Sequence, residues 1–550
     1  MNAHEGGREW QVITWAAIAF LALFLAWPLA GVFGRSVFAP GQGLTLEGYR
    51  MFFSEREYYG SLVNSLILGV TVTFLSTLLG GGLAFLVARC RFPLAIIAAA
   101  IPFAAFVIPD IVVAYSWILL LGNQGIVTLA LAKLGIPLPS IYGWFGLIFV
   151  MTLQNYSYAF ITMLVGFKAM DRNLEQAAAG LGSSPAQVFT RVTLPLITPA
   201  ILASALIVFT HVINSFGIPA VLGTTTPVLA VKIYNEFLNE MGSHPFIQSV
   251  MSSVLVLLAV GVMVLQKVLI ERRNFQMESG QAAVPEVLVG KARIVAVAIA
   301  SIFLVFSLVP IVAVGVASVS ETRGPLVFYG TFTMENFRRA FEISPDALWN
   351  SVFLATVATL FGAAFSMVTA YCIVKKRSRV TRALDLALLV PLAVAGTVLG
   401  IALVATFNSG WLVLTGTWIL MALAYFIRRM PLGVRSAASA LYNLRDSIEE
   451  ASISLGVKPI ATFFKVVIPV MRPAVIATAV LIWATTLSEL SATLVLYYGG
   501  MSTIPIEIYQ QIDSGRMAIA SAFSVILLTA IFVPLFIAQK VFRIDPFGVS

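Results

Sequence analysis

The feature that constrains this chain most is a series of apolar windows, each long enough to cross a bilayer. About twelve of them reach the roughly 20 residues that a membrane-spanning helix needs. Only 11% of the 550 residues are charged, whereas 59% are hydrophobic. Soluble domains carry about 25% charged residues, so a soluble globular protein is excluded. The sequence predicts an all-α integral membrane protein with about 12 transmembrane helices. The windows lie near residues 10–33, 60–88, 93–121, 141–165, 197–222, 246–270, 293–318, 350–375, 383–406, 411–430, 471–496 and 517–541.

Two segments near these windows need an interpretation of their own. Window 10–33 is too long for the core of a signal peptide and lacks a small-x-small cleavage pattern. We therefore interpret it as a retained span. For residues 123–140, which follow the third window, a short re-entrant helix is the alternative to a plain outer loop.

The chain also contains an internal repeat. Residues 176–195 recur at 450–469 with every landmark shifted by the same offset, so that Gly182 pairs with Gly456. Nearer the start of each copy the offset is slightly larger, and the pairs there are Asn64-Ser65 with Asn350-Ser351 and Pro109-Asp110 with Ala395-Gly396. Each copy holds an even number of windows, so both enter the membrane in the same sense and form parallel repeats.

The repeat defines the expected domain organisation. A six-helix unit spans residues 1–270 and a second spans 293–550, and the two are related by a pseudo-two-fold axis. Residues 271–292 form a polar linker between them. The repeated stretch lies in the loops 175–195 and 449–469.

Basic residues predict the orientation in the membrane. With the N-terminus inside, the outer loops hold 9 of the 34 lysine and arginine residues, and the rest lie at inner loops and helix ends. This bias follows the positive-inside rule, so both termini and both repeated loops are expected in the cytoplasm. The net charge of +9 is then a consequence of topology and does not indicate nucleic-acid binding.

The repeated stretch has the local chemistry of a helical elbow. Gly182 favours the left-handed conformation that ends a helix. Ser184 is a candidate N-cap, and Pro185 suits the first turn of a new short helix. That helix presents Phe189 on one side and is expected to end at Pro195. An elbow tipped by an aromatic ring is suited to docking; an ordinary amphipathic loop is the alternative.

The spacing of Glu-Ala-Ala, three residues, Gly, nine residues and Ile-x-Leu-Pro resembles the signature loop of permease subunits of binding-protein-dependent ABC importers. The departures are Gln176 at the acidic position, beside Glu175, and Ser452 at the second alanine. The resemblance implies a type I ABC importer fold, with coupling helices at 184–191 and 458–465 that contact an ATPase. The residues implied in that contact are Glu175, Gln176, Ala177, Gly182, Pro185, Phe189, Pro195, Glu450, Ala451, Gly456, Pro459, Phe463 and Pro469.

The resemblance also implies partners. The chain has no Gly-x4-Gly-Lys-Ser/Thr sequence, so a separate cytoplasmic ATPase dimer is expected to bind ATP and Mg. A periplasmic or lipid-anchored solute-binding protein is expected outside. The chain would be a transport subunit of a bacterial inner membrane, with no cofactor of its own and no enzymatic activity.

The fused two-unit architecture is similar to that of ferric-iron permeases, and also to thiamine and aminoethylphosphonate permeases. Residues 487–493, Leu-Ser-Glu-Leu-Ser-Ala-Thr, resemble the iron group most, so ferric iron is the expected solute. Two other classes stay open. A secondary transporter also has parallel repeats, and an intramembrane enzyme would need a nucleophile–base or metal-ligand set, which the spans do not offer.

Polar residues inside spans are costly and mark pathway candidates. They could equally form structural hydrogen bonds between helices. Scattered histidines (His4, His211, His244) and two cysteines (Cys90, Cys372) predict neither a metal site nor a disulfide. For ferric iron the chain would then offer only a weak acidic passage. The candidate pathway residues are Asp110, His211, Asn214, Ser488, Glu489 and Ser491.

Overall fold

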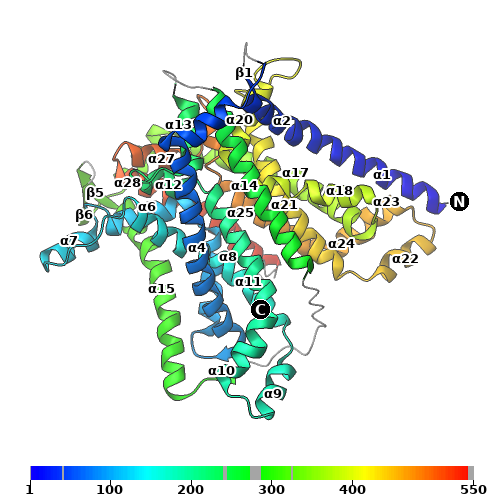
Figure 1. Cartoon of the computed structure of the whole chain (residues 1–550), viewed down its shortest axis with the longest axis horizontal. Helices are drawn as coiled ribbons and strands as arrows, with labels where there is room; N and C mark the ends of the chain where they lie inside the picture. The colour runs from blue at the N-terminus through cyan, green and yellow to red at the C-terminus, as the bar shows by residue number, and fades with distance from the viewer. Residues whose placement is uncertain (1, 40–42, 240–244, 273–285, 324–325, 543–550) are drawn as a thin grey trace.

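The computed structural model describes residues 2–39, 43–239, 245–272, 286–323 and 326–542, and almost all of its elements are helical (Figure 1). Nine helices are long and apolar enough to cross a membrane, or up to eleven if each of two bent pairs forms one span. This count refers to the described part of the chain. The prediction of an all-α polytopic membrane protein is confirmed.

The first half contains these helices: α1 (Asn2–Leu21), the π-helical η1 (Ala22–Ala26), α2 (Trp27–Val37), α3 (Glu47–Ser54), α4 (Arg56–Arg89), α5 (Ala95–Val107), α6 (Asp110–Leu121), α7 (Ile126–Lys133), α8 (Trp144–Ala169), α9 (Arg172–Gly180), α10 (Pro185–Val188), η2 (Phe189–Thr193), α11 (Leu194–Asn214), α12 (Gly217–Leu222), α13 (Leu229–Leu238) and α14 (Pro245–Arg272).

The second half contains α15 (Gly290–Ser318), α16 (Glu335–Ile343), α17 (Ala347–Lys375), α18 (Arg379–Ala387), α19 (Val390–Ala393), α20 (Gly396–Phe407), α21 (Trp418–Tyr442), α22 (Asp446–Ser454), α23 (Pro459–Thr462), η3 (Phe463–Val467), α24 (Ile468–Val470), α25 (Arg472–Leu487), α26 (Thr493–Leu496), α27 (Ile504–Asp513) and α28 (Met517–Phe542).

Short strands form three two-stranded ladders. β1 (Phe38–Ala39) pairs with β2 (Gly43–Leu44) and β5 (Ser320–Arg323) with β6 (Leu326–Phe332), both antiparallel. β3 (Cys90–Arg91), which follows α4, pairs in parallel with β4 (Glu286–Val287). The linker expected at 271–292 lies outside the described residues at 273–285, and its described end is thus tied to the end of α4.

The element order repeats at the offsets that the sequence shows. α6 and α20 begin at the matched residues Asp110 and Gly396, and α8 and α21 begin at two tryptophans that share the offset of the paired glycines. Matching serines make matching contacts: Ser65 Oγ accepts a hydrogen bond from the Leu229 N–H at 2.8 Å, and Ser351 Oγ accepts one from the Ile504 N–H at 2.9 Å. Each serine thereby anchors the start of an equivalent outer helix, α13 or α27.

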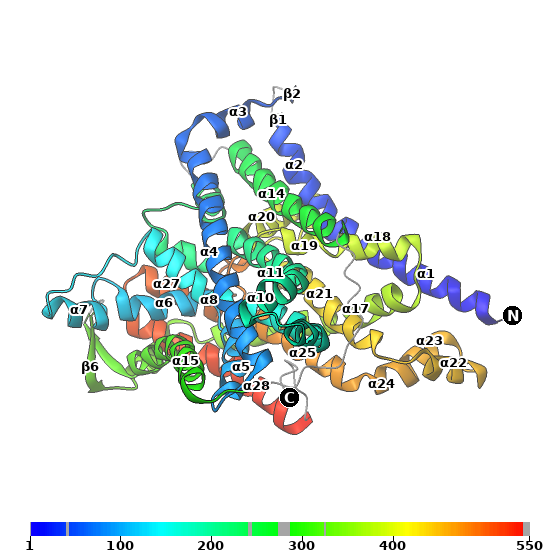
Figure 2. The ribbon, with the colours of Figure 1, turned by 60° about the horizontal axis from the view of Figure 1, so that its bottom comes forward.

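The first helical segment of each half packs against the other half. α1 and α2 pack on α18 and α20, while α15 packs on α5 and α6. Figures 1 and 2 show α1 beside the second-half helices and α15 beside α6. A direct bond also joins the halves, because the Tyr115 hydroxyl of α6 lies 2.9 Å from the Ser521 hydroxyl of α28. This exchange creates one continuous helical body.

Three window boundaries differ from the prediction. The third window is two helices, α5 and α6, separated at Pro109, and its counterpart in the second half bends by 106° before Gly396. The tenth window, predicted at 411–430, is wrong, because α21 begins only at Trp418 and continues to Tyr442. A short helix, α7, does form within 123–140, but it lies at the edge of the molecule and does not return into the bundle (Figure 2).

Candidate functional site

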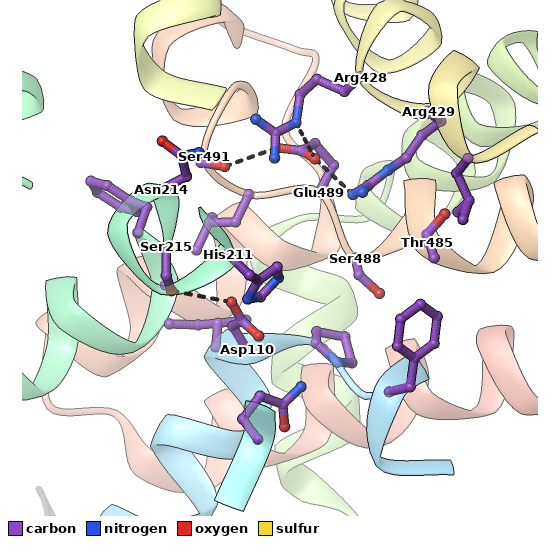
Figure 3. A pocket seen from close by; sticks show the side chains of 18 of the residues that line it. Asp110, His211, Asn214, Ser215, Arg428, Arg429, Thr485, Ser488, Glu489 and Ser491 are labelled. Carbon is purple, nitrogen blue, oxygen red and sulfur yellow. Dashed lines mark hydrogen bonds and ion pairs between the residues drawn. The ribbon is translucent and has the colours of Figure 1, made fainter. Parts of the chain in front are cut away.

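A cavity of about 260 Å³ lies where α6, α8 and α11 of the first half meet α19, α21 and α25 of the second. Both halves break their helices here. α5 gives way to α6 at Pro109, and α25 ends at Leu487 before a short non-helical stretch. Figure 3 shows the polar side chains that converge on this space. The six predicted pathway residues all line it: Asp110, His211, Asn214, Ser488, Glu489 and Ser491.

Glu489 is the most heavily bonded group in the cavity wall. Its side chain is only 2% exposed. One carboxylate oxygen accepts hydrogen bonds from Arg428 Nε at 2.9 Å and from the Arg429 guanidinium at 2.8 Å. The other accepts from the Ser491 hydroxyl at 3.0 Å and from the Ala492 N–H at 3.2 Å. Both oxygens of Glu489 are thus already engaged by donors of the second half, and its role in the pathway stays a prediction.

Arg428 and Arg429 were missed, because their charges were taken as the cytoplasmic end of the tenth window. They lie in the middle of α21 and line the cavity. The signal that finds them is the repeat itself. The offset between Gly182 and Gly456 lays the fourth window, 141–165, on 415–439 and pairs the arginines with Gln154 and Asn155.

Asp110 lies on the facing wall, at the first residue of α6 (Figure 3). A carboxylate at this position is favoured by the helix dipole. The Ser215 hydroxyl donates a hydrogen bond to Asp110 Oδ2 at 3.4 Å. In the second half the matching residue is Gly396, so the acidic group occurs in one half only.

His211 lines the cavity but acts as a link between α8 and α11. Its Nδ1 lies 2.9 Å from Asn155 Oδ1, and its Nε2 lies 2.8 Å from the Tyr158 hydroxyl. Because the Asn155 amide nitrogen donates to the Met151 carbonyl at 2.8 Å, its Oδ1 accepts the Nδ1 proton. Both ring nitrogens therefore have hydrogen-bond partners on α8. The structural alternative fits His211 best.

The remaining candidates make backbone contacts. Asn214 donates to the Ala393 carbonyl of the other half at 3.3 Å, and Ser488 donates to the Ala484 carbonyl at 3.2 Å. Asn214 Oδ1 is buried and has no hydrogen-bond partner. Among the residues that the structure describes, no three His, Cys, Asp or Glu side chains form a group that could hold a metal ion.

The two elbows follow the predicted course. Gly182 and Gly456 end α9 and α22 with φ values of 87° and 85°. Ser184 and Gln187 form a reciprocal capping box at the start of α10. The predicted exit at Pro195 is wrong, because η2 continues into α11 as one helix; its counterpart in the second half bends by 78° before Arg472.

The acidic residue that fixes each elbow is one position earlier than the motif indicates. Glu175 accepts a hydrogen bond from Thr193 at 2.7 Å and pairs with Arg89 at 3.4 Å. Its counterpart Glu449, which was missed, accepts hydrogen bonds from Tyr371 and from Lys376, the latter at 3.3 Å. Gln176 and Glu450 are exposed, so the substitution at that position leaves the anchor intact.

The aromatic rings of the two elbows have opposite environments. Phe189 is 41% exposed, with its ring 5.7 Å from that of Phe85. Phe463 is 1% exposed and packs edge-on against Trp10 of α1 at 5.3 Å. The expectation that Phe463 contacts a partner directly is therefore wrong for this arrangement, because α1 covers it.

Most of the other predicted contact residues lie on the surface, and Pro459 is half-buried. Sequence reasoning missed Leu181 and Leu455, which precede the two glycines and are 88% and 84% exposed. Their matching positions at the two tips make them candidates for contact with a partner. They are the matched apolar features that the two elbows share. The exposed predicted residues are Gln176, Ala177, Gly182, Pro185, Phe189, Pro195, Glu450, Ala451, Gly456 and Pro469.

Comparisons with known proteins agree with this architecture. Residues 57–275 and 362–543 each match the family described as binding-protein-dependent transport system inner membrane component. The ferric transport system permease protein FbpB of Actinobacillus pleuropneumoniae is 26% identical over 520 residues, which cover 93% of this chain and 75% of that protein. The putative 2-aminoethylphosphonate transport system permease protein PhnV of Salmonella paratyphi A is 25% identical over 256 residues, or 46% of this chain and 95% of that protein.

One similar solved structure is a bacterial alginate ABC transporter in complex with an alginate pentasaccharide-bound periplasmic protein. The match covers 50% of this chain and 97% of that chain, at 18% sequence identity and a TM-score of 0.40.

Proposed function

This chain belongs to the family of binding-protein-dependent transport system inner membrane components, and we propose that it supplies both permease halves of an ATP-driven importer. The family model matches each half once, so one polypeptide supplies both halves of the pathway. The observation that carries the proposal is the polar cavity where the two halves meet, with a glycine-ended helical elbow in each half.

The elbows are proposed to contact a separate ATPase dimer, which binds ATP and Mg. The chain itself has no Gly-x4-Gly-Lys-Ser/Thr sequence to do so. Leu181 and Leu455, at the two tips, offer matched apolar contacts for a symmetric partner. A solute-binding protein, periplasmic or lipid-anchored, is proposed to deliver the solute from the opposite side. The chain is a multi-pass inner membrane protein, and we place both termini and both elbows in the cytoplasm.

Ferric iron is the proposed solute. The relative named as a ferric transport permease matches 93% of this chain, whereas the one named for aminoethylphosphonate matches 46%. Aminoethylphosphonate, thiamine or another small phosphorylated solute is the second candidate. Arg428 and Arg429 in the cavity wall favour a solute with an acidic group, and they keep this candidate open.

The test is uptake into proteoliposomes that contain this chain, its ATPase and its binding protein. Labelled ferric iron, thiamine and aminoethylphosphonate are compared, each with ATP and with an ATPase whose phosphate-binding lysine is replaced. ATP-dependent uptake of one solute supports the proposal. Uptake by the chain alone, driven by an ion gradient, would instead identify a secondary transporter.

A further inference from the structure

We propose that the cavity binds its solute through an anionic oxygen group, held by Arg428 and Arg429. The inference rests on the proposed function and specifies the chemistry of the solute. Among the described residues that line the cavity, the charged ones are Asp110, Arg428, Arg429 and Glu489. They are divided between the walls: the second half carries a cluster with a formal charge of +1, and the first half carries one carboxylate.

The arginine cluster has donors to spare. Each guanidinium has five N–H donors, and each donates one hydrogen bond to Glu489. Arg429 Nε is buried and has no hydrogen-bond partner. The two side chains stay 19% and 21% exposed and line the cavity. Phosphate, phosphonate and carboxylate oxygens are the acceptors that such forked donors bind best.

The packing shows that the second half makes room for these groups. A Cβ at Gly396 would lie 2.5 Å from Arg428 Nη1, 2.4 Å from Ser491 Oγ and 2.9 Å from the Ala492 backbone nitrogen, so a larger residue would displace these groups. In the first half the matching residue is Asp110, and the residues that match the arginines are Gln154 and Asn155. Ser215 likewise matches Glu489, so the repeats have diverged in charge at four matching positions around one cavity.

This divergence gives the cavity two poles, which Figure 3 shows on opposite sides. When an oxyanion binds at the arginines, its cationic partner, a metal ion or an ammonium group, faces Asp110. Two sources share this chemistry: an oxyanion that accompanies ferric iron, and an organic phosphonate that carries its own ammonium group. A bare cation would be repelled by the net positive arginine cluster.

The experiment uses the reconstituted importer with two radiolabels. One arm supplies the binding protein loaded with labelled iron in labelled phosphate, and the other supplies labelled aminoethylphosphonate without iron. Phosphate that enters in a fixed ratio to iron identifies the metal–oxyanion source. Phosphonate uptake without iron identifies the organic source. Iron uptake with no accompanying anion, in a system that does not transport the phosphonate, overturns the inference.

Variants then test the residues. The triple change Arg428→Gln, Arg429→Asn and Glu489→Ser installs the side-chain types of the first half, Gln154, Asn155 and Ser215, so the fold has a precedent for them. Uptake is expected to fall at least about tenfold, as for the loss of one charge-assisted hydrogen bond. Full uptake by the assembled triple variant overturns the inference.

Two further variants keep the test decisive. Arg428→Lys with Arg429→Lys retains the charge without the forked donors and is expected to retain partial uptake. The matched control is Arg435→Gln on the same helix, whose side chain is 51% exposed and pairs with Asp385 at 3.0 Å outside the cavity. If the triple variant does not assemble, the inference is tested by uptake through the Arg429→Asn variant and by the double-label measurement on the natural chain. Absence of ATP-dependent uptake of any solute by the natural chain would instead contradict the proposed function.

Discussion

The first and second elbows share a sequence pattern and a backbone course, but they are held in different ways. In the first, Phe189 is 41% exposed and the short helix continues directly into α11. In the second, Phe463 is 1% exposed, packed on Tyr371 at 4.9 Å and on Trp10, and the helix bends by 78° before α25. The difference in exposure comes from α1, which crosses to the second half and places Trp10 against Phe463. Positions that match in sequence can thus contact a partner in one repeat and hold the fold in the other.

The largest expected difference follows from the two rings. Phe463→Ala should destabilise the chain by about 3–5 kcal/mol, as for other buried phenylalanines. Phe189→Ala should cost only about 1 kcal/mol, since its ring keeps much of its surface in water. Thermal unfolding of the purified chain in detergent measures both. Equal shifts for the two variants would mean that α1 does not cover Phe463 in the membrane.

A second difference concerns the acidic anchors. Glu449 has a side chain only 9% exposed, paired with Lys376 and Tyr371. Glu449→Gln should therefore cost about 1–3 kcal/mol, because it leaves charge-assisted bonds of a buried group unmade. Glu175→Gln should cost somewhat less, since the Glu175 side chain is 17% exposed and an amide oxygen can still accept from Thr193. Hydrogen exchange of the elbow amides reports both.

The control for this pair is Glu450→Gln, one residue along the same helix and exposed to solvent. It should leave exchange in α22 unchanged. If Glu450→Gln increased hydrogen exchange in α22 as much as Glu449→Gln does, the anchoring residue would be the one at the motif position, Glu450.

At their tips the two elbows are expected to contribute equally to association with the ATPase. Leu181→Ser and Leu455→Ser are each expected to weaken association with the ATPase about tenfold, by removing an apolar side chain from a buried contact. Co-purification at graded ATPase concentrations measures this. Leu134→Ser is the matched control, because Leu134 is 72% exposed but follows α7, on the outer side of the predicted topology. Loss with only one tip variant would show that the ATPase contacts the elbows unequally.

Much of this fold could be predicted because its determinants are local. Apolar windows mark spans, and Gly182, Ser184 and Pro185 mark a helix end and a new helix start. The parallel repeats follow from matched spacing. The six candidate pathway residues line one cavity, since polar residues within spans turn toward a cavity or a partner helix.

The rest depended on contacts between distant segments. Trp10 and Phe463 lie near opposite ends of the chain, so no local pattern shows that the indole buries that ring. Arg428 and Arg429 were assigned to a helix end, because two adjacent charges normally stop a span. Their pairing with Glu489 offsets the cost of burial, and that compensation is visible only in three dimensions.

The smallest expected difference lies at the start of each elbow. Asp171 caps α9 by accepting a hydrogen bond from the Asn173 N–H at 2.9 Å, whereas Asp446 of α22 bonds to Lys375. The hydrogen bond and the charge of Lys375 lower the pKa of Asp446 from its ordinary 3.8. A lowered pKa contributes stability above the ordinary value and loses it as the pH falls through the folded-state value. The second elbow should therefore loosen slightly, and only below about pH 4.

Replacement of Lys375 by methionine tests this assignment. Lys375→Met should return the pKa of Asp446 close to its ordinary value, because both the hydrogen bond and the main nearby charge are lost. An NMR titration of isotope-labelled aspartate carboxyls measures it, with Arg377→Met as a neighbouring control. Because Asp446 is exposed, the change in stability should be small even though the titration shifts. A titration of Asp446 that is the same in Lys375→Met and in the natural chain would show that Lys375 does not hold this carboxylate at the start of the second elbow.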